Sequence, residues 1–62
     1  MCLSSVYKKT SDESIFMLKN IADVKISGET LVFVDLMGVR TEIEGKILEI
    51  DLMENIITIS AE

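Results

Sequence analysis

The residues best suited to chemistry lie at the amino terminus, where the only cysteine, Cys2, follows Met1. A thiolate next to a backbone or terminal nitrogen forms a chelate, and such donors suit a square-planar Ni(II) or Cu(II) ion. If Met1 is removed, Cys2 supplies both the amine and the thiolate. If Met1 stays, the donors are its amine, the Cys2 amide nitrogen and the thiolate. One nitrogen and sulfur pair per chain is half of an N₂S₂ site, so two chains would share one ion.

Other interpretations of Cys2 stay open from its position alone. A free cysteine is most often a small buried hydrophobic residue. Zinc prefers four tetrahedral ligands that usually include histidine or more cysteines, and this chain contains no histidine. A single unpaired cysteine is typical of a reducing compartment, which predicts a cytoplasmic protein.

The acidic residues form two pairs on predicted strands. Glu42 and Glu44 are two positions apart, as are Glu49 and Asp51, so each pair shares one face of its strand. Paired carboxylates can transfer protons or bind hard cations, but a solvated face of a sheet explains them more simply. The chain has no nucleophile–base motif and no glycine-rich phosphate loop, so we expect that it is not an enzyme.

The internal methionines and the aromatic residues are expected in the core. The methionines are Met17, Met37 and Met53. They should fill gaps between strands, because thioether ligands for Cu(I) would be more closely spaced. The aromatic residues are Tyr7, Phe16 and Phe33. They could stack on bases, but 11 acidic against 6 basic residues, a net charge of −5, disfavour contact with phosphates.

The length of 62 residues predicts a single small domain over residues 1–62. One cysteine cannot close a disulfide, and a domain of this size is marginally stable alone, so we expect a homodimer. The start lacks the basic and apolar segments of a signal peptide, and no apolar run is long enough to span a membrane.

Apolar and polar residues alternate with a period of two along most of the chain, for example at Val39, Thr41 and Ile43. Turn signals at residues 27–29 and 54–55 separate these runs. The pattern predicts an all-β protein, a small barrel of about six short antiparallel strands. A helix over residues 11–20 is the alternative, disfavoured because its apolar stripe covers only one turn.

Several details of that barrel can be tested. The run 15–18 should be a strand buried on both faces, and a break should follow at Lys19-Asn20. Ile50 and Leu52 should face inward, as should Ile57 and Ile59.

A set of short motifs extends over nearly the whole chain. They are Met1-Cys2-Leu3-Ser4, Val6-Tyr7, Asp35-Leu36-Met37-Gly38, Ile43-Glu44-Gly45-Lys46, Ile50-Asp51-Leu52 and Glu54-Asn55-Ile56-Ile57. In this combination they resemble the CooT family of small nickel-binding proteins. The resemblance implies a small dimeric β-protein that binds Ni(II) through Cys2, in the manner of a metallochaperone. The implied client is a nickel enzyme such as carbon monoxide dehydrogenase. Many relatives are described as predicted RNA-binding proteins, so a small RNA-binding or protein-interaction module is the alternative.

Overall fold

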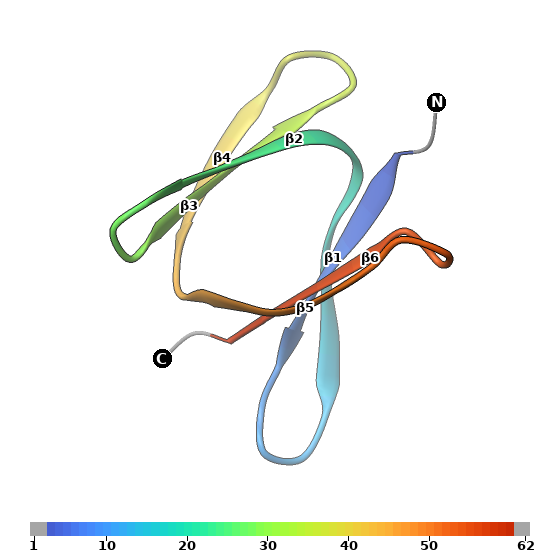
Figure 1. Cartoon of the computed structure of the whole chain (residues 1–62), viewed down its shortest axis with the longest axis vertical. Coiled ribbons are helices and arrows are strands. Elements are labelled where there is room, and N and C mark those ends of the chain that lie inside the picture. Colours follow the sequence, from blue (N-terminus) through green and yellow to red (C-terminus); the bar gives the residue numbers. More distant parts are fainter. Residues whose placement is uncertain (1–2, 61–62) are drawn as a thin grey trace.

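The computed structural model describes residues 3–60, and the regular structure in this range is entirely β (Figure 1). The strands are β1 (Ser4–Lys9), β2 (Ser14–Ser27), β3 (Thr30–Asp35), β4 (Arg40–Glu44), β5 (Lys46–Asp51) and β6 (Ile56–Ser60). The prediction of an all-β protein with six strands is confirmed. The alternative helix over residues 11–20 is wrong, because β2 already begins at Ser14.

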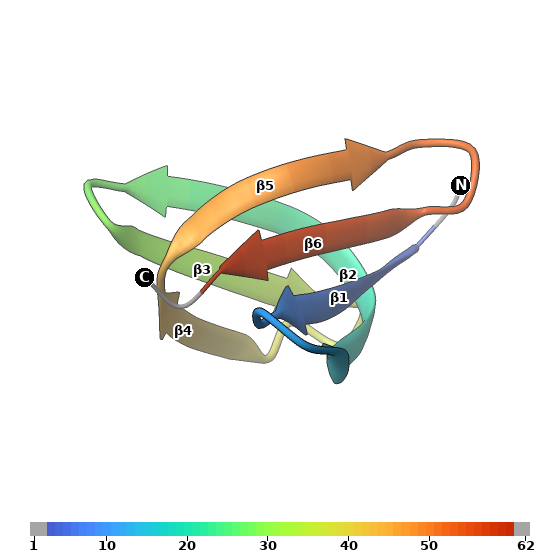
Figure 2. The same ribbon diagram turned by 90° about the horizontal axis from the view of Figure 1, so that it is seen from below.

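All six strands belong to one curled sheet with the order β4-β3-β2-β1-β6-β5 (Figure 2). Four of the neighbouring pairs are antiparallel, but β1 and β6 are parallel. The sheet also stays open, since its edge strands β4 and β5 do not pair with each other. Only Gly45 separates β4 from β5, and one residue cannot reverse the chain as an antiparallel pair requires.

β2 is long and bent, and it links the two halves of the sheet. Its first half pairs with β1 and its second half pairs with β3. The predicted break at Lys19-Asn20 is instead a bend within one strand, where Asn20 adopts a φ of 57°. Asparagine tolerates this left-handed backbone better than most residues. As a result, Ile21 lies opposite both Ser4 at the start of β1 and Asp35 at the end of β3.

The two predicted turns occur where the sequence places them. Gly28 and Glu29 connect β2 to β3, and the pair Ser27–Thr30 closes the turn. A positive φ of 60° at Gly28, the first of the two central residues, is typical of a type II′ hairpin turn. The turn before β6 ends at Asn55, which adopts a φ of 59°.

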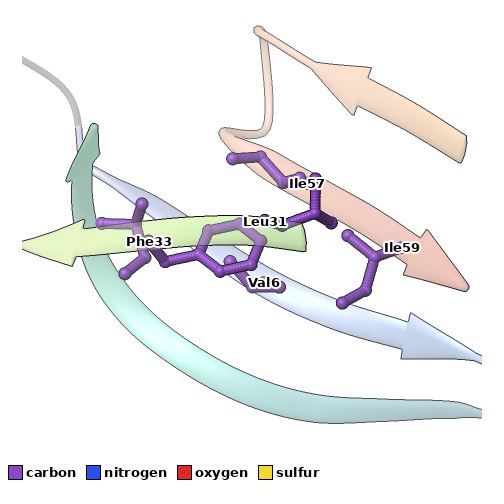
Figure 3. Packing of buried hydrophobic residues seen from close by; sticks show 6 residues of the cluster. Val6, Leu31, Phe33, Ile57 and Ile59 are labelled. Carbon is purple, nitrogen blue, oxygen red and sulfur yellow. The ribbon is translucent and has the colours of Figure 1, made fainter. Parts of the chain in front are cut away.

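The core lies on the concave side of the curled sheet, and Figure 3 shows its packing. Its buried residues are Val6, Ile21, Leu31, Phe33, Ile57 and Ile59. The inward orientation predicted for Ile57 and Ile59 is confirmed. The same prediction is wrong for Ile50, on an edge strand, and for Leu52, which is 80% exposed in the turn beyond β5.

The first half of β2 is less buried than its apolar sequence predicts. Ile15 and Phe16 are exposed, so the prediction of a strand buried on both faces is wrong. The hairpin of β1 and β2 extends beyond the rest of the sheet there, and no second layer covers it (Figure 1). Phe16 packs edge-to-face against Tyr7, with ring centroids 5.5 Å apart and planes at 73°. Of the three aromatic residues, only Phe33 is fully buried.

Candidate functional site

The predicted metal ligand, Cys2, lies outside the described residues, and the first strand that follows it in the sequence is β1. β1 begins at Ser4 in the middle of the sheet, between β2 and β6. Ser4 lies opposite Ile21, and the Ser5 amide donates a hydrogen bond of 2.9 Å to the Asn55 carbonyl. The start of β1 is therefore held by hydrogen-bonded neighbours on both sides.

Two similar turns flank the start of β1. The first, residues 35–39, connects β3 to β4, and its Leu36 amide donates to the Asn20 carbonyl at 2.9 Å. The second, residues 51–55, connects β5 to β6 and contacts Ser5 through Asn55. Figures 1 and 2 both show the start of β1 between these turns.

Both turns begin with the same three residues, Asp-Leu-Met, and we call them the Asp-Leu-Met turns. One carboxylate oxygen of Asp35, Oδ1, accepts hydrogen bonds from the amides of Met37 and Val39, each 2.9 Å long. Asp51 Oδ1 likewise accepts from the amides of Met53 and Glu54, each at 3.0 Å. Aspartate often fixes a turn in this way.

The hydrogen bonds of each aspartate hold the methionine two positions later on the outside of the protein. Met37 is 83% exposed and Met53 is 92% exposed, so the prediction that they fill the core is wrong. Met17, in contrast, packs against the core as predicted. The repeated Asp-Leu-Met sequence was the signal for this arrangement, because aspartate at the first position of a turn directs the following residues into a loop.

The predicted acidic pairs are solvated or structural. Glu42 and Glu44 are exposed on the edge strand β4, as expected for a polar face. Glu49 is exposed, whereas the Asp51 carboxylate accepts the two amides of its turn. Within residues 3–60, no three acidic side chains come together in a way that could hold a metal ion.

Comparisons with known proteins gave one family model and one similar fold. A family model described as "CO dehydrogenase accessory protein CooT" matches residues 1–60. The fold is similar to a crystal structure titled as a "putative CooT" from Carboxydothermus hydrogenoformans, with a TM-score of 0.89 and 23% sequence identity. That match covers 98% of each chain. A comparison with curated protein sequences gave no significant match. In the described part of the chain, no helix is long and apolar enough to cross a membrane.

Proposed function

The chain belongs to the CooT family of CO dehydrogenase accessory proteins, and on this premise we propose that it carries Ni(II), bound through Cys2, to such an enzyme. The family description names an accessory protein rather than an enzyme, in agreement with the sequence prediction. A metal carrier needs a donor set that binds its ion firmly yet can give it up. The thiolate of Cys2 and the nitrogen beside it form such a set at the end of the chain.

The observation that carries this proposal is the combination of the family match with the amino-terminal Met-Cys sequence. A cysteine thiolate is a metal ligand, and a planar set of four donors suits Ni(II). A cytoplasmic location would keep the thiol reduced and able to bind.

A homodimer completes the proposed site. One chain contributes one thiolate and its neighbouring nitrogen, and a second chain contributes the other half of a square-planar N₂S₂ set. The open sheet also leaves the hydrogen-bonding groups of β4 and β5 without a strand on their outer sides, and such edges are often covered.

Nickel titration is expected to give one Ni(II) per two chains. Equilibrium dialysis measures this ratio, and sedimentation at tens of micromolar protein measures the mass of the complex. Binding should weaken as the pH falls, because the ion competes with protons for the thiolate. A peptide tag on the amino terminus, which removes the free amine, should weaken binding without changing the circular dichroism. A protein that sediments as a monomer with and without nickel would contradict the shared site.

A further inference from the structure

We propose that the open edge of β2 at residues 14–19 binds an extended peptide segment of another protein, one in which acidic and apolar side chains alternate. β3 pairs with β2 only from Ile21 onward, whereas residues 14–19 pair with β1 alone. Figure 1 shows the hairpin of β1 and β2 extending beyond the rest of the sheet at this place. The amide and carbonyl groups on the outer side of such an edge can pair with an added strand.

The edge segment is apolar and exposed. Ile15 is 38% exposed and Phe16 is 51% exposed, and Met17 beside them is half-buried. Proteins usually protect an unpaired edge with charged side chains, prolines or bulges. Exposed apolar side chains gathered on an edge are typical of a binding surface instead.

The hairpin that carries this edge is already ordered. The rings of Tyr7 and Phe16 pack edge-to-face with their centroids 5.5 Å apart. In the turn, the Thr10 amide donates to the Glu13 carbonyl at 2.8 Å, and Thr10 Oγ1 accepts from the Glu13 amide at 3.1 Å. A partner strand therefore does not have to order the hairpin when it binds, which favours affinity.

Charge selects the kind of strand. Three of the six basic residues, Lys8, Lys9 and Lys19, lie in residues 4–9 and 14–19, and these two segments contain no acidic residue. The outer strands β4 and β5 instead carry Glu42, Glu44, Glu49 and Asp51. An acidic strand is therefore attracted to the edge of β2 and repelled from the edges of β4 and β5.

The two faces of the edge explain the alternation expected in the partner. On the concave side, the edge presents Ile15 and Met17, and Met17 packs against the core. Lys9 and Lys19 lie on the convex side, because side chains alternate between the faces of a strand. An added strand matches both faces when its apolar side chains point to the concave side and its acidic side chains point to the convex side.

This edge lies away from the proposed nickel ligand. It begins at Ser14, opposite Lys9, and Lys9 is separated from Ser4 by five residues of β1, or roughly 16 Å of strand. A Ni(II) ion shared at Cys2 brings two copies together at the other end of β1. Direct pairing of the two β2 edges in a dimer would place the lysines of both copies side by side, which is unfavourable.

Nuclear magnetic resonance of the isotope-labelled full-length protein tests the inference, with a short synthetic peptide of alternating glutamate and valine as the probe. The amide signals of residues 14–19 should shift, and their hydrogen exchange should slow. A matched peptide with lysine in place of glutamate should bind about tenfold more weakly or worse, because its charge is reversed. A peptide N-methylated at alternate residues should lose as much, because it cannot form the hydrogen bonds of an added strand.

Variants of the protein locate the contact. Ile15→Ser/Lys19→Glu should raise the Kd for the glutamate peptide about tenfold or more. Leu48→Ser is the matched control: Leu48 is 54% exposed on the edge strand β5, and its loss should leave binding unchanged. Cys2→Ser should also bind the peptide as tightly as the unmodified protein, because strand addition does not use the thiol.

Several results would overturn the inference. They are no measurable binding of the glutamate peptide, equal binding of the N-methylated peptide, and signal shifts confined to β4 or β5. A smaller mass of Ile15→Ser/Lys19→Glu in sedimentation would assign the edge to a second copy of the chain. Binding of single-stranded RNA that is lost in the same variant would assign it to a nucleic acid.

Discussion

Replacing Cys2 with serine is expected to abolish stoichiometric Ni(II) binding while the sheet stays folded. The change substitutes a hydroxyl, which stays protonated near neutral pH, for a thiol that can ionise and bind the ion. Loss of a residue that only supports a metal ligand typically lowers affinity by about 10- to 100-fold. Loss of the ligand itself should cost at least as much. Isothermal titration with nickel measures the affinity, and far-UV circular dichroism checks the fold.

The outcome shows whether nickel binds at Cys2 or at the carboxylates. The buried core of the described residues is built from β1, β2, β3 and β6, and serine is close to cysteine in size, so we expect no loss of secondary structure. Glu42→Gln/Glu44→Gln serves as the control, because these exposed residues should not affect nickel binding. A Cys2→Ser protein that still binds one Ni(II) per two chains would place the site elsewhere, and loss of nickel binding in the control would point to the carboxylates of β4.

Replacing Phe33 with alanine should unfold a large fraction of the protein. Phe33 is fully buried on the central part of β3, where its ring contacts the cluster shown in Figure 3. Truncation of a buried phenylalanine costs about 3–5 kcal/mol, which is comparable to the whole free energy of unfolding of a small domain. For a chain of this size, 1 kcal/mol corresponds to about 4–8 °C, so Tm should fall by at least about 12 °C.

Phe16→Ala is the matched control for this change. The Phe16 side chain is half exposed and loses mainly its edge-to-face contact with Tyr7, which is worth about 0.5–1.5 kcal/mol beyond its area. Thermal unfolding followed by circular dichroism compares the two variants. Equal losses of Tm would contradict the position of Phe33 at the centre of the core.

Local patterns in the sequence predicted most strands and turns correctly. The alternation at Thr41 and Ile43 and the turn residues Gly28 and Asn55 depend on neighbouring positions, so the sequence shows them directly. Val39, which begins the same alternation, lies before β4 and is 59% exposed, so its expected inward orientation is wrong. The parallel pairing of β1 with β6 depends on residues at opposite ends of the chain, and no local pattern indicates it. The sheet stays open because a single residue, Gly45, connects β4 to β5. The effect of this short connection can be recognised only once the strand order is known.

Residue type alone gave mixed results for the candidate site. Cys2 could be singled out because its chemistry does not depend on the fold. The exposure of Met37 and Met53 could not be predicted from hydrophobicity, which favours burial for both. Their exposure follows from the capping aspartates Asp35 and Asp51, whose effect depends on where β3 and β5 end.

X-ray absorption at the nickel K-edge tests nickel binding through Cys2 most directly. For protein loaded with one Ni(II) per two chains, we expect a four-coordinate planar ion with two sulfur and two nitrogen neighbours, one pair from each Cys2 and its adjacent backbone. A six-coordinate shell of oxygen and nitrogen without sulfur would contradict the proposed site.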